Sequence, residues 1–188
     1  MGTSTEVALS RIAILENQEL ESPKGILPAE LYCELLALYL LTNDLANAKF
    51  LWKRIPADVK SDSAELKAVW EVGKNAWQQN FAGVHTALDS YDWSEQCRPV
   101  MSQHKENLRE NCLNMIAGSY TSVKITYLAQ ILGLDKSTAL ELVKNRGWEY
   151  SEEKEIVKPM KTKQIMECKP KNEEHLERLT QYILFLET

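Results

Sequence analysis

The sequence predicts a mostly α-helical fold, for three reasons. Only seven glycines and six prolines interrupt its 188 residues, and these residue types most often end helices. Between them, apolar residues recur at spacings of three and four, the period of a helix with one buried face. Short stretches with the composition of strands follow after residue 119. We therefore expect many helices and one small sheet.

The first helix is expected to begin at Thr3, which forms an S/T-x-x-E capping box with Glu6. Residues 22–25 contain a proline and a glycine and should end it. Its apolar face would consist of Leu9, Ile12, Ala13 and Leu20.

The next two helices should form a hairpin. Pro28 suits the first position of a helix, where its missing N–H has no partner in any case. The leucines that follow fall at spacings of four, three and three, and their neighbours widen the stripe, so we expect burial on two sides: Leu31, Leu35, Leu36, Leu38, Tyr39 and Leu41. Asn43 and Asp44 offer a turn and a cap for a helix that ends at Pro56.

Two further helices should extend this series. Asp62 and Glu65 form a cap pair for a helix that runs to Gln79, and residues 81–88 supply a shorter one. The tryptophans of this part lie at helical spacing, which favours core packing over an aromatic binding surface: Trp52, Trp70 and Trp77. Successive antiparallel helices of this size resemble TPR-like helical repeats.

The longest regular pattern predicts one helix over residues 94–118. Its apolar positions follow steps of three and four throughout: Cys97, Met101, His104, Leu108, Cys112, Met115 and Ser119. After it, Ile125–Leu132 and Lys136–Asn145 have helical periodicity, and residues 120–124, 147–150 and 155–158 look like short strands. The order of short strand, two helices and hairpin predicts a winged helix.

The last part of the chain is divided into a connector and a final helix. Residues 158–171 hold Pro159, Pro170 and many lysines without an apolar period, and we assign the connector to residues 160–172. The helix expected over residues 173–188 carries a seam of apolar positions with aromatic neighbours: Leu176, Leu179, Tyr182, Ile183, Phe185 and Leu186. Such a terminal helix often docks onto a partner, and the pattern also allows it to fold back onto its own domain.

Composition limits the classes of function. The 22 basic and 27 acidic residues give a net charge of -5, so no long-range field favours nucleic acid. No apolar run reaches the roughly 20 residues that cross a bilayer, and the first residues do not resemble a signal peptide. The cysteines are widely spaced without a CxxC pair, as expected of reduced thiols in an intracellular protein: Cys33, Cys97, Cys112 and Cys168.

No catalytic motif is present in the sequence. HExxH, Walker A, GxGxxG and GxSxG patterns are all missing. Of the widely separated histidines, His104 lies on the apolar stripe and should be a hydrogen-bonded core or interface residue, whereas His85 and His175 should be solvated. We therefore expect no enzyme, no metal, no cofactor and no small-molecule substrate.

The predicted winged helix leaves nucleic-acid binding as a second hypothesis. Its second helix would enter the major groove, as in other readers of this type. The charges there are Lys136, Lys144 and Arg146 against Asp135 and Glu141. A net of about one positive charge is weak for an anchor on phosphates, so nucleic acid is an unlikely partner.

A helical stack, a winged helix and a detached helix in this order resemble the PCI-domain family, found in the proteasome lid, the COP9 signalosome and a translation initiation factor. Short segments narrow the resemblance to the signalosome's subunit 8 family: ENQELE at 16–21, LLALYLL at 35–41, FLWKRIP at 50–56, YDWS at 91–94, SYTS at 119–122, GW at 147–148 and LERLT at 176–180. They span nearly the whole chain.

The resemblance implies a non-catalytic scaffold subunit of the complex that deneddylates cullin-RING ubiquitin ligases. The metal-dependent hydrolase would reside in another subunit, and the partners would be other signalosome subunits, especially those with PCI domains. It also implies residence in nucleus and cytoplasm. A PCI subunit of another complex is the alternative within the family.

The resemblance also implies which residues meet the partners. In the family, winged helices associate edge to edge, and C-terminal helices of several subunits gather into a bundle. Here an edge strand at 155–158 would offer unpaired backbone groups, which makes Ile156 and Val157 candidates. The final helix adds Leu176, Leu179, Tyr182, Ile183 and Leu186.

We divide the chain into repeats at 1–93, the long helix and winged helix at 94–159, the connector at 160–172 and the assembly helix at 173–188.

Overall fold

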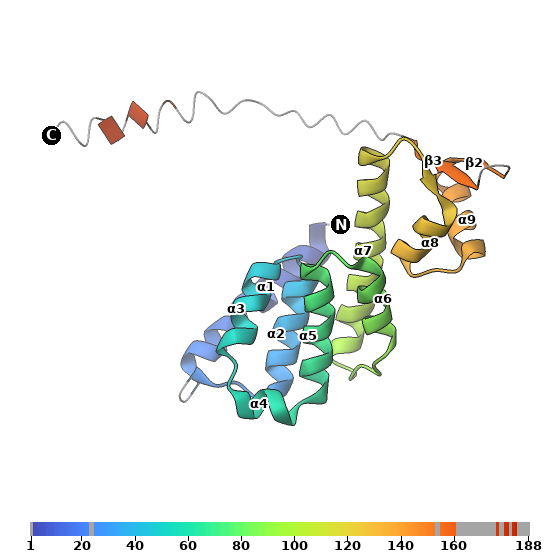
Figure 1. Cartoon of the computed structure of the whole chain (residues 1–188). Helices are drawn as coiled ribbons and strands as arrows, with labels where there is room; N and C mark the ends of the chain where they lie inside the picture. The colour runs from blue at the N-terminus through green and yellow to red at the C-terminus, as the bar shows by residue number, and fades with distance from the viewer. Residues whose placement is uncertain are drawn as a thin grey trace.

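The computed structural model describes residues 2–22, 25–152 and 155–160, together with residues 176, 179, 180, 182 and 183. The elements run in the order shown in Figure 1: α1 (Gly2–Glu21), α2 (Ala29–Leu41), α3 (Leu45–Arg54), α4 (Ala57–Asp62), α5 (Ala64–Trp77), α6 (Phe81–Asp89), α7 (Cys97–Ser119), β1 (Val123–Lys124), α8 (Ile125–Leu132), α9 (Lys136–Asn145), β2 (Glu149–Ser151) and β3 (Ile156–Lys158). The prediction of a mostly helical chain with one small sheet is confirmed.

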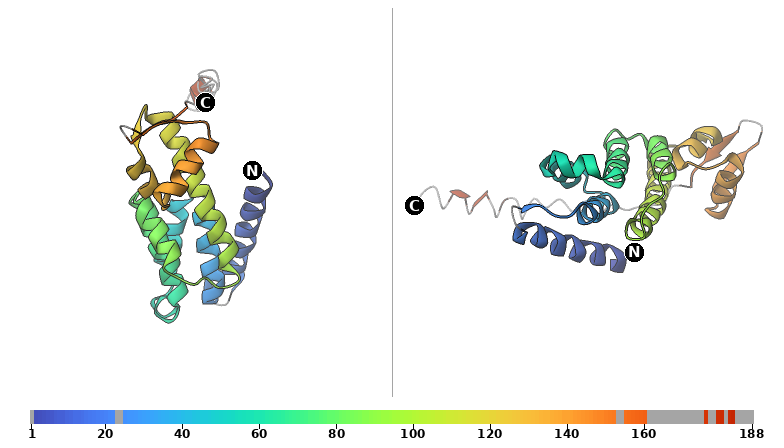
Figure 2. Two further views of the ribbon diagram at one scale, coloured as in Figure 1. Left: turned by 90° about the vertical axis from the view of Figure 1, so that its right-hand side faces the viewer. Right: turned by 90° about the horizontal axis from the view of Figure 1, so that it is seen from below.

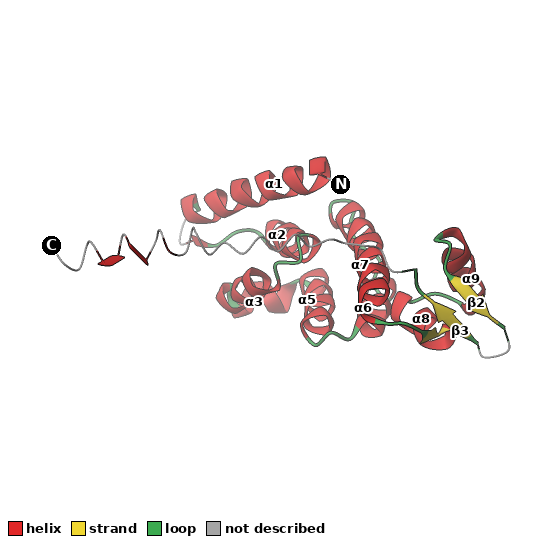
Figure 3. Ribbon diagram, turned by 90° about the horizontal axis from the view of Figure 1, so that it is seen from above, coloured by secondary structure: helices red, strands yellow, loops and turns green. Residues whose placement is uncertain are grey.

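Helices α1 to α7 form what we call the helical part of the molecule, and α2 is its centre. It contacts α1, α3, α5 and α7. Figures 2 and 3 show α1 on one side of α2, with α3 and α5 on the other. Eight of its side chains are buried, including the unbroken run from Leu35 to Leu40. The burial on two sides that the leucine spacing predicts is therefore confirmed.

The helix caps match the sequence at α3 and differ at α5. The carboxylate of Asp44 accepts a hydrogen bond from the backbone N–H of Asn47 at 3.0 Å, as expected of the α3 cap. At α5 the hydroxyl of Ser63 accepts from the N–H of Leu66 at 3.1 Å. The cap predicted at Asp62 is wrong by one residue, because Asp62 is the last residue of the short helix α4.

Helix α1 uses a different face from the predicted one. It already includes Gly2, so the expected cap at Thr3 lies inside the helix. Of the predicted face only Ile12 is buried, and Leu20 is 82% exposed. The buried positions are instead Ala8, Ile12, Leu15 and Glu19. These four positions also have helical spacing, but a search for apolar positions does not include the charged residue Glu19.

Helix α7 belongs to two hydrophobic clusters. Its first half, through Met101, completes the cluster formed by α1 to α6. Its second half joins α8, α9 and the sheet through Cys112, Leu113, Ile116 and Ala117. The predicted stripe holds as far as Cys112, but Met115 and Ser119 are exposed. The prediction fails there because the second cluster packs on a rotated face of the helix.

The sheet has the strand order β1-β3-β2, with both pairs antiparallel. Val157 lies opposite Val123 of β1 on one side and opposite Tyr150 of β2 on the other. The expectation that residues 155–158 form an edge strand is therefore wrong. Ile156 and Val157 lie on the central strand, because β1 pairs with the side of β3 that β2 leaves free. We call residues 123–158 the sheet unit.

Candidate protein-interaction surfaces

The predicted seam of the C-terminal helix is exposed. Its four described members, Leu176, Leu179, Tyr182 and Ile183, have helical backbone and are between 55% and 67% exposed. The hydroxyl of Thr180 donates a hydrogen bond to the carbonyl oxygen of Leu176, four residues earlier, at 2.8 Å. Leu186 and Phe185 lie outside the described residues. The seam therefore offers a row of aliphatic and aromatic side chains that water still contacts.

The sheet offers an interaction edge that the sequence pattern does not indicate. Val157 is fully buried in the second cluster, and Ile156 is partly buried, so neither presents its side chain freely. The outer strands are β1, with two residues, and β2, with three. Glu149 and Ser151 of β2 are exposed, whereas Tyr150 packs on the cluster. A partner strand could pair with the backbone of β2.

A pocket of about 370 Å³ lies where α6, α7 and α8 meet. We call it the junction pocket; its apolar lining includes Phe81, Cys112, Met115, Tyr120, Tyr127 and Ile131. Met115, Tyr120 and Tyr127 are each nearly half exposed, between 45% and 49%. The sequence pattern places Met115 in the core and gives Tyr127 no role, because neither the rotation of the α7 face nor the position of α8 is visible in it.

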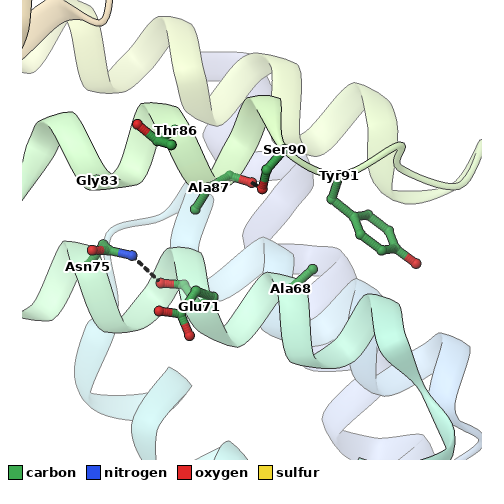
Figure 4. A pocket seen from close by; sticks show the side chains of 8 residues that line it. All are labelled: Ala68, Glu71, Asn75, Gly83, Thr86, Ala87, Ser90 and Tyr91. Carbon is green, nitrogen blue, oxygen red and sulfur yellow. Dashed lines mark hydrogen bonds between the residues drawn. The ribbon is translucent and has the colours of Figure 1, made fainter.

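A second groove, of about 480 Å³, runs between α5 and α6 (Figure 4). Ala68, Glu71 and Asn75 come from α5, whereas Gly83 and Ala87 come from α6. The two helices approach so closely that a Cβ atom on Gly83 would lie 2.5 Å from the side-chain oxygen of Asn75. Apart from Tyr91, the residues that line the groove are small or polar.

Helix α1 is held by ion pairs and presents apolar side chains outward. The guanidinium of Arg11 donates to Glu34 at 2.6 Å, and that of Arg54 donates to Glu19 at 2.8 Å. The hydroxyl of Tyr39 also donates to the carboxylate of Glu16. The exposed apolar residues of α1 are Val7, Leu9, Ile14 and Leu20. Val7 and Ile14 lie on one flank of the helix and Leu9 and Leu20 on the other, so they do not form one continuous apolar surface.

Two histidines are buried between the helical part and the sheet unit. His104 is 6% exposed, which confirms its predicted burial, whereas His85 is 2% exposed and the expectation that it is solvated is wrong. His85 is covered because it packs against Gly133 at the end of α8. In the described part of the chain, both ring nitrogens of His85 and Nε2 of His104 have no hydrogen-bond partner. Burial lowers the pKa of both rings to about 4.

The described residues include potential metal ligands and buried free thiols. Among them, no three His, Cys, Asp or Glu side chains are placed to hold a metal ion, and no helix is long and apolar enough to span a membrane. Burial raises the pKa of the free thiol of Cys33 to about 12 and that of Cys97 and Cys112 to about 11. These thiols are protonated at neutral pH. Cys168 and His175 lie outside the described residues.

The basic residues of the predicted nucleic-acid reader have other partners. The ammonium group of Lys136 pairs with Glu155 across the sheet unit. Arg146 pairs with Glu110 of α7 and donates to the side-chain oxygen of Asn114 at 3.3 Å. The contacts of Arg146 join the sheet unit to α7. Together the two ion pairs use two of the three cations that the sequence offers to phosphates.

The tryptophans differ in burial. The rings of Trp52 and Trp70 stack at 5.0 Å between centroids and pack on the first cluster, as predicted. Trp77 is 51% exposed, so its expected place in the core is wrong. The ammonium nitrogen of Lys49 lies 4.1 Å from the centroid of the Trp77 ring, which partly covers the indole.

Comparison with known proteins places these surfaces in context. Residues 26–167 match the family described as CSN8/PSMD8/EIF3K. The chain is 40% identical to COP9 signalosome complex subunit 8 of Xenopus laevis over 172 residues, which cover 92% of this chain and 88% of that protein. It is 30% identical to subunit 8 of Dictyostelium discoideum, with 92% and 87% covered, and 28% identical to that of Arabidopsis thaliana, with 79% and 75% covered.

Proposed function

The chain belongs to the CSN8/PSMD8/EIF3K family, and we propose that it acts as a non-catalytic assembly subunit of a COP9 signalosome. In this proposal it contributes to cullin deneddylation only through contacts with other subunits. The hydrolytic centre would reside in another subunit. The chain would act in both the nucleus and the cytoplasm. The identity to relatives named as subunit 8 over 92% of the chain supports this assignment.

We further propose that the arrangement is that of a PCI domain. The helices α1 to α6 would correspond to TPR-like repeats, and α7 would lead from them into a winged helix formed by the sheet unit. The order β1, α8, α9, β2 and β3, with β3 between the other two strands, supports this interpretation. The contact of α8 with both α6 and α7 would hold the two parts together.

The exposed seam of the C-terminal helix is the observation that carries the proposal. Leu176, Leu179 and Ile183 are apolar, helical and more than half exposed. Burying a Leu or Ile side chain contributes about 1.5–3 kcal/mol, against about 0.5–1.5 kcal/mol for each side chain that loses its freedom. Burial among the helices of partner subunits would therefore favour assembly.

The edge of β2 would supply a second contact. A strand of a partner's winged helix can satisfy the free backbone groups of Glu149–Ser151 and extend the sheet. The charged side chain of Glu149 is exposed at this edge. Such a charge discourages pairing with unrelated strands, so the edge would accept a partner of complementary charge more readily than a second copy of itself.

Incorporation of seam variants into the complex tests the proposal. A tagged chain with Leu179→Asp and Ile183→Asp should recover at most a tenth of the partner subunits that the unchanged chain recovers from the same cells. Both side chains are exposed, so the substitutions should not unfold the chain. Gln181→Asp is the matched control, because position 181 lies outside the three-four spacing of the seam.

The outcome separates assembly from folding. Equal recovery of partner subunits by the double variant and the unchanged chain would contradict the role of the seam. Loss of recovery with Gln181→Asp as well would show that charge alone, and not the apolar row, is responsible. Circular dichroism of each purified variant confirms that the helical fold is retained.

A further inference from the structure

We propose that, before the chain meets its partners, its own C-terminal seam docks into the junction pocket. The seam consists of Leu176, Leu179, Tyr182 and Ile183, and the pocket is the one lined by Met115, Tyr120 and Tyr127. This goes beyond the proposed function, because it concerns a state of the chain outside any complex. The docked segment would then be a placeholder that partner helices displace.

The apolar parts of the two surfaces match in chemistry, and the pocket is also lined by the polar residues Gln79, Asn80 and Gln130. The seam presents aliphatic and aromatic side chains that are more than half exposed. The pocket presents the side chain of Met115 and the rings of Tyr120 and Tyr127, which are nearly half exposed around a concavity of about 370 Å³. A flexible methionine beside aromatic rings adapts well to aliphatic side chains. The exposed apolar residues of α1 lie on a convex helix and enclose less of a bound side chain.

The described chain leaves the sheet at the end of the β1–β3 pair where the segment that follows Tyr120 enters it. β1 and β3 are antiparallel, with Val123 opposite Val157. Tyr120 precedes Val123 by three residues, and Met160 follows Val157 by three residues. Because the strands run in opposite directions, Tyr120 and Met160 lie at the same end of the pair. The described chain therefore leaves the sheet unit at the same end of the strand pair as Tyr120, which forms part of the pocket wall.

The chain between Met160 and Leu176 is long enough for docking. Sixteen residue steps separate them. A chain of sixteen residue steps spans at most about 55 Å when it is fully extended. A tethered segment of this kind has an effective concentration on the order of millimolar at a neighbouring site. Docking therefore requires only a weak intrinsic affinity.

A labelled peptide tests the docking. The probe is a fluorescent peptide of residues 172–188, added to three proteins: the full chain, the full chain with Leu179→Asp and Ile183→Asp, and a chain that ends at Met160. All buried residues of both hydrophobic clusters lie between Ala8 and Val157, so the shortened chain retains its core. We expect the peptide to bind the second and third proteins at least tenfold more tightly than the first, whose own segment competes.

Pocket variants locate the binding. In the chain that ends at Met160, Met115→Asp should weaken peptide binding at least tenfold, and Tyr127→Asp should do the same. Leu9→Asp on α1 is the matched control, since Leu9 is exposed to a similar extent, and it should leave the affinity unchanged. Circular dichroism identifies a variant that fails to fold. If one pocket variant does so, the affinity of the peptide for the other pocket variant tests whether the pocket is the binding site.

Three results would overturn the proposal. These are equal affinity of the peptide for the full chain and the shortened chain, no binding to any of the three proteins, and loss of binding with Leu9→Asp but not with the pocket variants. None of them bears on incorporation into the complex, because the seam can bury itself among partner helices whether or not it docks beforehand. Failure of this inference is therefore distinguishable from failure of the proposed function.

Discussion

His85 on α6 and Gly133 at the end of α8 pack so closely that a Cβ atom on Gly133 would lie 2.5 Å from both Cβ and Cγ of His85. Gly133 also has a φ angle of 59°, in the left-handed region that caps the helix. α6 belongs to the helical part and α8 to the sheet unit. The pair therefore fixes how closely the two parts of the molecule approach.

Gly133→Ala should destabilise the protein more than an ordinary glycine substitution. The left-handed backbone costs an alanine about 1–2 kcal/mol, and forcing a methyl group against a buried ring adds about 1–3 kcal/mol. Gly147→Ala is the matched control, because Gly147 has a φ angle of 72° with nothing within 4 Å of the added atom. Unfolding in urea measures the free energy of unfolding of both variants. Equal losses of stability would contradict the close packing at Gly133.

Acidification should destabilise the fold through the two buried histidines. Burial is the main cause that lowers the pKa of each ring from 6.5 to about 4. The charges of Arg109 and Lys105 lower the pKa of His85 further, whereas Asp89 raises it. His85 in turn lowers the pKa of His104. Between pH 4 and pH 6.5 the unfolded chain binds more protons than the folded chain. The stability that the neutral rings contribute to the fold is therefore complete above pH 6.5 and is lost as the pH falls toward 4. At pH 5 the loss is about 2 kcal/mol per ring.

A variant isolates the histidine contribution. His104→Met removes one titrating ring and keeps an apolar side chain in its place. The difference in the free energy of unfolding between pH 7 and pH 5 should therefore shrink by about 2 kcal/mol relative to the unchanged protein. The same difference in both proteins would show that other groups dominate the acid response.

Arg54→Met should loosen α1. It leaves the carboxylate of Glu19, a residue only 8% exposed, without its guanidinium partner. Because Arg54 is itself about half exposed, we expect a loss of about 1–3 kcal/mol in the free energy of unfolding. Adding Glu19→Gln should restore part of it. Arg98→Met, whose partner Asp92 is almost fully exposed, should change stability by about 0.5 kcal/mol or less. A greater loss for the double variant than for Arg54→Met would contradict the account.

The sheet unit should not bind nucleic acid with salt-sensitive affinity. Lys136 and Arg146 are already paired with Glu155 and Glu110, and the whole chain has a net charge of -5. Fluorescence anisotropy with labelled duplex DNA at low salt should show no saturable binding by the purified chain. Saturable binding that Lys144→Glu abolishes would instead support the second hypothesis from the sequence.

The helical elements could be predicted because they repeat locally. The bounds Ile125–Leu132 and Lys136–Asn145 agree with the sequence pattern, and Asp44 caps α3 as expected. Local spacing also predicted an apolar C-terminal seam, whose described members are exposed. Its role in assembly stays a prediction.

Several of the misses share one physical cause, which is that the contacts involved join residues far apart in the chain. Glu19 is buried on α1 because Arg54 reaches it from α3. His85 is buried by Gly133, 48 residues away in the sequence. The order of the strands depends on β1 pairing with β3, which no local pattern encodes. The junction pocket arises in the same way, from three helices that periodicity describes only one at a time.

Purification of the tagged chain from its own cells tests the central claim most directly. A full-length chain and one that ends at Lys171 are expressed side by side, recovered gently, sized and identified by mass spectrometry. The full-length chain should elute in a large assembly with other signalosome subunits, including the metal-dependent hydrolase, and the shortened chain should recover much less of it. A full-length chain that elutes alone or with nucleic acid would contradict the assignment as an assembly subunit.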